Sequence, residues 1–345
     1  MTTAPATDAR IRPLIQKAST GAHLTRAEIQ TALETMISGE ATPAQMGAFL
    51  MALRVRGETI EEITGAAELL RARMTPVTAP PGTIDIVGTG GDSHGTYNIS
   101  TCTAIVAAGA GAQVAKHGNR SVSSKSGASD VLAALGVKLD ISPETVSRCI
   151  ETAGVGFMWA PMHHAAMKHF APVRADLGIR TIFNVLGPLS NPARVTRQVI
   201  GVYARDLVEP IAHVLKNLGS EHALVVHGSD GMDELTTTGP SFVAELKSGE
   251  VTTYEVGPSD AGLPSAKLAD LIGGDANVNA QAIRDLLDGK RGAYRDIVVL
   301  NAAAAMIVAG KAGDLAAGAK LAETAIDTGA AKNALAKLVE TSNAG

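Results

Sequence analysis

The stretch "IDIVGTGGDSHGTYNISTCTAIVAAG", Ile84 to Gly109, decides the fold class of this chain. A short apolar run at 84–87 leads into a glycine-rich turn, and a longer run with helical spacing begins near Ser100. This order predicts a strand, a loop and a helix. In open α/β sheets ligands bind beside such loops, and a helix start offers N–H groups to an anion. The stretch therefore predicts an α/β fold with a loop suited to phosphate.

The loop matches neither standard phosphate-binding fingerprint. Gly88 and Gly90 begin a G-x-G-x-x-G, but Ser93 takes the third glycine position. Gly90 to Gly95 fits G-x-x-x-x-G, but Thr96 stands where a P-loop has lysine. Asp92 suits a phosphate site only if a cation lies between them. A strand-to-helix turn that needs glycine only for its geometry remains the alternative for this loop taken alone.

Short apolar runs alternate with helical ones on either side of this stretch. Strands are predicted at 84–87, 113–116, 154–158, 198–203 and 222–227, and helices at 100–110, 128–135, 143–153, 206–218 and 293–310. Such alternation predicts a mainly parallel sheet covered by helices. Residues 234–256 differ: they predict antiparallel strands, with turns at Gly239-Pro240 and Ser248-Gly249. The alanine-rich tail beyond 310 is predicted to be helical.

The N-terminal part of the chain is predicted to be a separate helical module. Between Leu24 and Met74 three helical patterns each begin with a cap-like tetrad: Thr25 with Glu28, Thr42 with Gln45, and Thr59 with Glu62. A proline-rich connector, "TPVTAPPGT", follows at 75–83. Residues 162–192 are largely helical without a clear strand. We therefore expect a small α-helical domain at 1–77, to which helices from about 163–192 return, and a larger α/β domain at 78–345.

Composition narrows the class of protein. The chain has 345 residues, of which 46% are hydrophobic but only 3% aromatic, so its core must consist mainly of Ala, Val, Leu and Ile. A formal net charge of −4 argues against a nucleic-acid surface. No segment approaches the roughly 18 apolar residues of a membrane span. Cys102 and Cys149 lack metal-ligand spacing and are expected to be reduced, buried thiols. We expect a cytoplasmic chain that binds neither nucleic acid nor membrane.

Two further stretches carry polar groups suited to a charged ligand. In "KHGNRSVSSKSGASD", 116–130, Lys116 is the main phosphate candidate, although a solvated helix-entry loop is the alternative. In "GSDGMDELT", 228–236, Asp233 and Glu234 are adjacent. Paired carboxylates can hold Mg²⁺, which keeps several waters and bridges to phosphate oxygens, although most such pairs are merely solvated.

Several motifs together resemble one known family. "GTGGD" with "NIST", "KHGNRSVSSKSGASDVLAALG", "RADLGIRTIFNVLGPLSNP" and "GMDELT" are similar to the motifs of anthranilate phosphoribosyltransferases, in the same order and over nearly the whole chain. The resemblance implies the nucleoside phosphorylase/phosphoribosyltransferase class of fold, of the anthranilate type. It also implies a homodimer through the helical domain, a place in tryptophan biosynthesis, Mg²⁺ as cofactor, and anthranilate and phosphoribosyl pyrophosphate (PRPP) as substrates.

Carried over by position, the resemblance implies the following residues. PRPP would be bound by Gly88, Gly91, Asp92, Thr96, Asn98, Ile99, Ser100, Thr101, Lys116, His117, Gly118, Asn119, Arg120, Ser121, Val122, Ser123, Ser124 and Ala128. Anthranilate would be bound by Gly88, Asn119 and Arg174, and the metal by Ser100, Asp233 and Glu234. Ala128 stands where many members have serine, so a hydroxyl contact is absent there. No general base is assigned, because His117 and His164 are explained more simply as structural residues.

Two other functions are weighed against this one. A pyrimidine nucleoside phosphorylase has a similar fold and a "GTGG" loop, but Asp92 directly after Gly91, together with "NIST" and "KHGNR", favours the transferase. A non-catalytic relative that binds nucleic acid is disfavoured by the net negative charge and by the presence of Arg174, Asp233 and Glu234.

Overall fold

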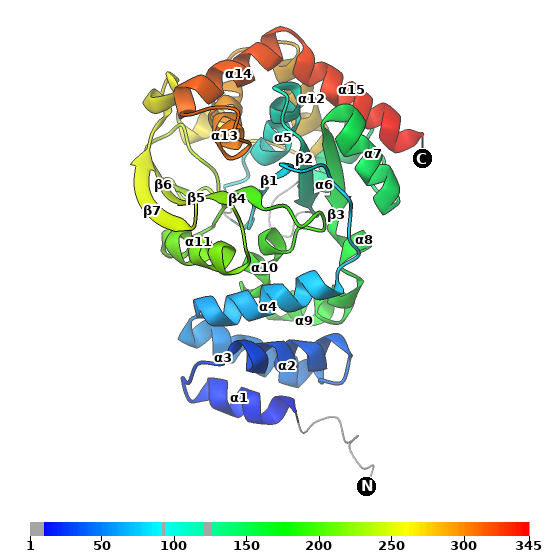
Figure 1. Cartoon of the computed structure of the whole chain (residues 1–345), viewed down its shortest axis with the longest axis vertical. Coiled ribbons are helices and arrows are strands. Elements are labelled where there is room, and N and C mark those ends of the chain that lie inside the picture. The colour runs from blue at the N-terminus through cyan, green and yellow to red at the C-terminus, as the bar shows by residue number, and fades with distance from the viewer. Residues whose placement is uncertain (1–9, 92–93, 121–125, 345) are drawn as a thin grey trace. The chain divides into compact units, whose positions relative to one another are not determined.

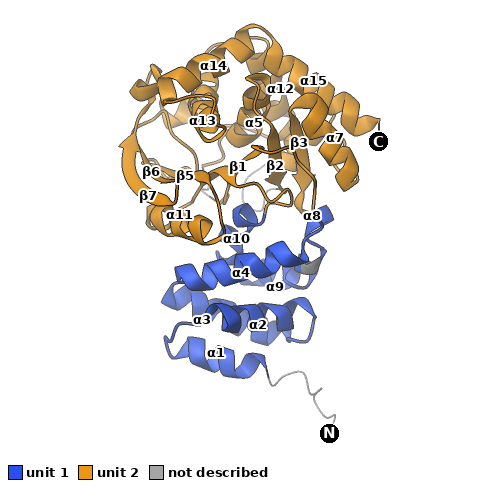
Figure 2. Ribbon diagram, viewed as in Figure 1, with its two compact units in different colours: residues 1–75, 161–190 blue, residues 76–160, 191–345 orange. Residues whose placement is uncertain are grey.

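The computed structural model describes residues 10–91, 94–120 and 126–344, which form two compact units (Figure 2). Unit 1 consists of Met1–Thr75 and Pro161–Ser190, and unit 2 of Pro76–Ala160 and Asn191–Gly345. Five residues expected at the PRPP site lie outside the described residues: Asp92, Ser121, Val122, Ser123 and Ser124.

Unit 1 is helical and is built from two separate stretches of chain. Its helices are α1 (Ile11–Ser19), α2 (Arg26–Ile37), α3 (Pro43–Arg56), α4 (Ile60–Arg73), α8 (Ala160–His163), α9 (Ala171–Leu177) and α10 (Phe183–Leu189). Helix α4 contacts α10, and α3 contacts α9. Arg71 Nε donates a hydrogen bond to Leu189 O (2.7 Å), and the Thr75 N–H donates to His163 O (2.9 Å). The second stretch is therefore fastened to the first by backbone carbonyls as well as by packing.

The predicted caps of unit 1 are confirmed. Thr25, Thr42 and Thr59 each accept the N–H of the residue three positions on, whose side chain returns to the cap N–H. Glu62, which completes the last of these boxes, is fully buried and is bound by Arg56 Nη2 at 2.6 and 2.7 Å. Helix α1 had no sequence prediction, because its N-cap residue, Arg10, makes no side-chain cap.

A seven-stranded sheet with the order β3-β2-β1-β4-β5-β6-β7 forms the centre of unit 2. Its strands are β1 (Ile84–Gly88), β2 (Val114–Gly118), β3 (Val155–Trp159), β4 (Arg197–Gly201), β5 (His222–Gly228), β6 (Ser241–Lys247) and β7 (Glu250–Val256). Strands β1 to β5 are parallel, and β6 and β7 are antiparallel. The prediction of a mainly parallel sheet is confirmed, and so is the turn at Ser248-Gly249, where φ is 51° and 79°.

The first antiparallel strand begins later than predicted, at Ser241 instead of near residue 234. Residues before it form a tight loop around Asp230, whose Oδ2 accepts the hydroxyls of Thr236 and Thr238, each at 2.6 Å. The threonines that suggested a strand thus make a local side-chain network instead.

Helices cover both faces of the sheet (Figure 1). They are α5 (Ile99–Gly109), α6 (Ala128–Ala134), α7 (Pro143–Ala153), α11 (Val208–Asn217), α12 (Ala276–Leu287), α13 (Ala293–Val308), α14 (Leu315–Asp327) and α15 (Ala330–Asn343). Helices α5 and α13 pack together over the strands, with α14 and α15 outside them, and α11 packs on β5 and β6 from the other side.

The core of unit 2 is aliphatic, as the composition predicts. Alanines 302–305 of α13 are completely buried, and a Cβ on Gly109 would lie 2.5 Å from the backbone of Ala331, so α5 and α15 meet at backbone contact. Cys102 and Cys149 are buried free thiols, as expected. Among the described helices, none combines the length and the apolar character that crossing a membrane requires.

Candidate active site

The glycine loop after β1 is packed against the loop that carries the predicted metal ligands. Gly88 ends β1 beside Gly201 of β4. A Cβ on Gly88 would lie 2.3 Å from Asp233 Oδ2, and a Cβ on Gly201 would lie 1.5 Å from Asp233 O. The Gly90 N–H donates to Asp233 Oδ2 at 2.6 Å. Two glycines are therefore required so that Asp233 can cross the carboxyl ends of two neighbouring strands.

The start of α5 offers unpaired donors at this edge of the sheet. Asn98 is the N-cap residue, but its side chain does not cap the helix. Among the described residues, the N–H groups of Ser100 and Thr101 have no hydrogen-bond partner, and the Thr101 hydroxyl is buried without one. Unpaired N–H groups at a helix start, together with the helix dipole, favour an anion.

Lys116 brings a buried positive charge to the same place. Its Nζ donates to Ile86 O (2.6 Å) and to Ser100 Oγ (3.3 Å), and the residue is 3% exposed. Burial lowers the pKa of Lys116, while the negative charges of Asp85, Glu234 and Asp233 oppose that shift. The ammonium group is thus tied to the first turn of α5 and electrostatically linked to both predicted metal ligands.

Asp85 was not among the predicted site residues, although a carboxylate inside an apolar strand run is a signal of a buried polar role. Asp85 is fully buried; its Oδ1 accepts the His117 N–H (3.2 Å) and its Oδ2 accepts Asn191 Nδ2 (2.7 Å). Burial raises the pKa of Asp85 to about 6, against the opposing effects of the Lys116 charge and these hydrogen bonds. Asp85 joins β1 and β2 to the chain just before β4 and carries a counter-charge for Lys116.

The second predicted loop follows β2 at the same edge of the sheet. A Cβ on Gly118 would lie 2.8 Å from the ring of Phe157, so this position must be glycine. Asn119 and Arg120 are exposed. The Arg120 guanidinium lies 5.8 Å from the ring centroid of Trp159, and its Nε is 3.8 Å from Asp130 Oδ1. Arg120 can therefore reach a ligand at the loop.

The described PRPP candidates all belong to unit 2 and gather at the carboxyl ends of β1 and β2. They are Gly88, Gly91, Thr96, Asn98, Ile99, Ser100, Thr101, Lys116, His117, Gly118, Asn119, Arg120 and Ala128, the last being the first residue of α6. Hydrogen bonds from the Tyr97 N–H to Leu271 O (3.0 Å) and from the Gly273 N–H to Gly95 O (2.9 Å) join the glycine loop to the segment before α12.

Asp233 and Glu234 can contribute to a Mg²⁺ site only together with other ligands. Within the described ranges, no cluster of three or more His, Cys, Asp or Glu side chains suited to a metal is found. Two carboxylates and the Ser100 hydroxyl would leave room for water and phosphate oxygens as further ligands. This donor set fits Mg²⁺, which prefers oxygen ligands, keeps waters and is usually shared with a bound phosphate.

Arg174 lies on α9 of unit 1, with its guanidinium 5.5 Å from the ring centroid of Phe183. No carboxylate in the described part of the chain lies within 4.0 Å of it, so the alternative salt bridge with Asp176 is not formed. Burial lowers the pKa of Arg174. A half-buried guanidinium stacked on a ring is suited to a planar carboxylate.

His163 and His164 do not supply an evident base. Burial, with the nearby His163, lowers the pKa of His164 to about 4, against a backbone hydrogen bond to Ser190. His163 Nδ1 lies 3.0 Å from Thr75 O, and burial lowers its pKa as well. Both side chains serve to pack the second stretch of the unit.

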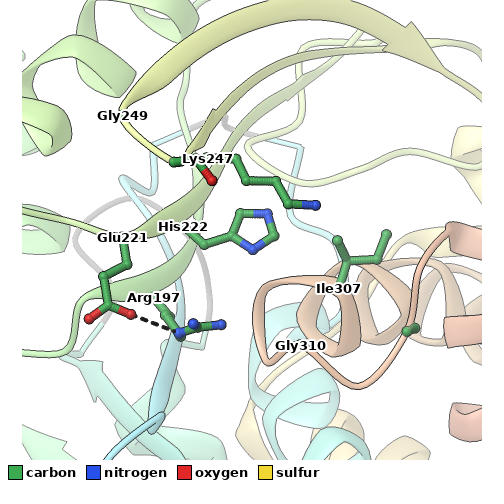
Figure 3. Close-up of a pocket in the computed structure, with 9 residues that line it drawn as sticks. Arg197, Glu221, His222, Lys247, Gly249, Ile307 and Gly310 are labelled. Carbon is green, nitrogen blue, oxygen red and sulfur yellow. Dashed lines mark hydrogen bonds and ion pairs between the residues drawn. The ribbon is translucent and has the colours of Figure 1, made fainter.

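A cavity of about 500 Å³ lies at the opposite edge of the sheet (Figure 3). Arg197 and His222, which line it, are the first residues of β4 and β5, whereas the glycine loops follow the strand ends. Arg197 Nε is paired with Glu221 Oε2 (3.2 Å), and His222 Nε2 lies 2.8 Å from Glu245 Oε1. These residues stabilise the amino-terminal edge and are no part of the site described above.

Comparisons with known proteins agree with the resemblance seen in the motifs. The α/β-domain model of the glycosyl transferase family matches residues 80–332, and its helical bundle domain model matches 12–74. Anthranilate phosphoribosyltransferase of Parvibaculum lavamentivorans is 64% identical over 332 residues, covering 96% of this chain and 97% of the relative. The enzyme of that name from Rhodopseudomonas palustris (strain BisA53) is 60% identical over 332 residues, covering 96% and 98%.

Solved structures give the same result. The crystal structure of anthranilate phosphoribosyltransferase from Thermus thermophilus has a TM-score of 0.90 and 41% identity, covering 95% of this chain and 99% of the other. The Saccharomyces cerevisiae enzyme in complex with PRPP and Mg has a TM-score of 0.90 and 28% identity, covering 98% and 99%. The fold predicted from the sequence, a small helical domain and a larger α/β domain, is confirmed.

Proposed function

The chain belongs to the anthranilate phosphoribosyltransferase family, and we propose from this that it transfers the phosphoribosyl group of PRPP to the amine of anthranilate. The products are N-(5-phosphoribosyl)anthranilate and pyrophosphate. The observation that carries the proposal is the pair of unpaired N–H groups of Ser100 and Thr101, beside the buried charge of Lys116. The names of the relatives favour this function over a pyrimidine nucleoside phosphorylase and over a nucleic-acid-binding relative.

The reaction needs no protein nucleophile. The amine nitrogen forms a bond to the ribose C1 while the bond from C1 to the pyrophosphate oxygen breaks, and the bonding electrons leave with pyrophosphate. The amine loses its proton as the new bond forms, and because no protein base is assigned, the proton passes to water or to the departing pyrophosphate. The protein must therefore align the amine with C1 and stabilise the negative charge that grows on the leaving oxygen. The α5 start and Lys116 supply donors and positive charge for that purpose.

We propose Asp233, Glu234 and Ser100 as the protein ligands of Mg²⁺. When bound, the ion would neutralise charge on the pyrophosphate. The support is the carboxylate pair next to the glycine loop and the Mg-containing complex of the yeast relative. Lys116 and the N–H groups at the start of α5 would supply further donors to the phosphate oxygens.

For anthranilate, we propose Arg174 as the partner of the carboxylate, with Gly88 and Asn119 as further contacts. The free guanidinium of Arg174 supports this role, because its two parallel N–H groups match a carboxylate. The remaining residues of the PRPP set, Asp92 and 121–124 included, are proposed on the motif resemblance alone.

We also propose that the protein acts in tryptophan biosynthesis, in the cytoplasm, as a homodimer joined through unit 1. The dimer and the location are proposed on the family resemblance alone. Light scattering after size-exclusion chromatography would give a mass of twice 35.3 kDa if the dimer is correct. A single-chain mass at micromolar concentration would refute it.

The function is tested with the purified chain, PRPP, Mg²⁺ and anthranilate, by following the loss of anthranilate fluorescence. We expect turnover that requires all three additions. A parallel reaction with thymidine or uridine and inorganic phosphate tests the phosphorylase alternative. Phosphorolysis without any anthranilate turnover would overturn the proposal.

A further inference from the structure

Asn279 in the first turn of α12 is connected to the candidate site although no sequence motif pointed to it. It is 2% exposed, and its Oδ1 accepts the Gly274 N–H at 2.8 Å. Its Nδ2 donates to Asn98 Oδ1 at 2.9 Å. A Cβ on Gly273 would lie 2.7 Å from Asn279 Oδ1, so the segment before α12 closes tightly around this side chain.

The hydrogen bond from Asn279, with a longer one from the Ser126 hydroxyl at 3.4 Å, fixes which way the Asn98 carboxamide points. A carboxamide has one accepting end and one donating end. With its Oδ1 held by Asn279, Asn98 presents its Nδ2 to Ser126 O at 3.2 Å. Asn98 is the N-cap residue of α5, and Ser126 lies in the second predicted stretch, two residues before α6. One oriented side chain thus joins the start of α5 to the segment just before α6.

We propose that Asn279 is a positioning residue for PRPP, which orients Asn98 so that the start of α5 stays joined to Ser126. Asn279 does not touch substrate in this scheme, which rests on the function proposed above. Its Nδ2 donates to Asn98 Oδ1 at 2.9 Å and, over a longer 3.3 Å, to Gly274 O, while its Oδ1 accepts the Gly274 N–H. If Asn279 served only the fold, its one task would be to hold the start of α12 together.

The test replaces Asn279 with aspartate. Asn279→Asp keeps the size and the acceptor for the Gly274 N–H, but it places a second acceptor against Asn98 Oδ1. We expect the KM for PRPP to rise roughly tenfold, while the KM for anthranilate changes less than about twofold. Calorimetric titration with PRPP in the absence of anthranilate should show the same roughly tenfold loss, and the melting temperature should fall by only a few degrees.

Asn277→Asp is the matched control, because Asn277 is exposed on the same helix and gains the same charge. Its kinetic constants should equal those of the wild type. A wild-type KM for PRPP in Asn279→Asp, or equal losses in both variants, would overturn the positioning role. If Asn279→Asp does not fold, Asn279→Ala takes its place, because it removes the donor without adding charge. The same rise in the KM for PRPP is then expected, and a wild-type KM would overturn the positioning role. Wild-type protein without anthranilate turnover would instead refute the proposed function itself.

Discussion

Replacing Gly88 with alanine tests whether the position of Asp233 controls activity. The new Cβ would lie 2.3 Å from Asp233 Oδ2 and 2.9 Å from its Cγ, whereas ordinary contacts begin at 3.4 Å. The carboxylate must therefore move by about 1 Å and give up its 2.6 Å bond from the Gly90 N–H. The backbone of Asp233 cannot shift with the side chain, because Asp233 O is already packed against Gly201 of β4. A misplacement of about 1 Å in a catalytic group costs roughly a hundredfold in rate.

The assay compares kcat/KM and the Mg²⁺ concentration for half-maximal rate in Gly88→Ala and wild type. We expect kcat/KM to fall roughly a hundredfold with a raised Mg²⁺ requirement, while the lost hydrogen bond costs about 1.5–3 kcal/mol of stability. Gly313→Ala is the matched control, because a Cβ there meets nothing within 4 Å. Near-wild-type turnover and Mg²⁺ dependence in a folded Gly88→Ala protein would refute the argument.

Three further changes have defined outcomes. Arg174→Ala should raise the KM for anthranilate about ten- to a hundredfold and leave that for PRPP nearly unchanged, because a charge-assisted pair contributes roughly 1.5–3 kcal/mol; the reverse pattern would assign Arg174 to the phosphate side. Asp233→Asn combined with Glu234→Gln keeps the shapes but removes both charges, and should raise the Mg²⁺ needed for half-maximal rate at least about tenfold; an unchanged requirement would remove the metal role. Glu62→Gln should cost about 3 kcal/mol at pH 7 in urea unfolding, because it breaks the buried pair with Arg56. Burial raises the pKa of Glu62, but its hydrogen bonds, the one from Arg56 foremost, outweigh burial and hold that pKa below 4.5. The stability difference between wild type and Glu62→Gln should therefore be full above pH 4.5 and disappear as the pH falls through the pKa of folded Glu62. A stability difference that is the same at low pH would refute this prediction.

The predictions that succeeded rest on interactions between neighbours in the chain. Thr25, Thr42 and Thr59 each cap a helix together with the residue three positions on, so a segment of four residues is enough to predict the capping box. Helix α12 carries a comparable signal, since Asp275 accepts the N–H groups of Asn277 and Val278, but it was not recognised. The predicted strand start near residue 234 was wrong, because Asp230 accepts the hydroxyls of Thr236 and Thr238 and holds these residues in a loop.

The site could be predicted only as separate pieces. The two loops and the Asp233–Glu234 pair could be proposed from the sequence, because each is a short polar stretch with its own chemistry. That Gly90 donates to Asp233 could not be read from the sequence, because the two residues are 143 positions apart. The same holds for Asn279 and Asn98, which are 181 positions apart. Such pairs depend on the strand order, which sequence periodicity does not supply.

Because unit 1 is built from two separate stretches of the chain, it stays incomplete until the second stretch has been synthesised. At about 5–20 residues per second, roughly 115 residues separate the emergence of Thr75 from that of Ser190, which corresponds to about 6–23 s. Throughout that interval α4 lacks α10, its contact partner, and Arg71 lacks the carbonyl of Leu189. Strands β1 to β3 are made in the meantime. The nascent chain therefore carries an incomplete helical module while the sheet begins to form, and an N-terminal fragment ending at Thr75 would retain that defect permanently.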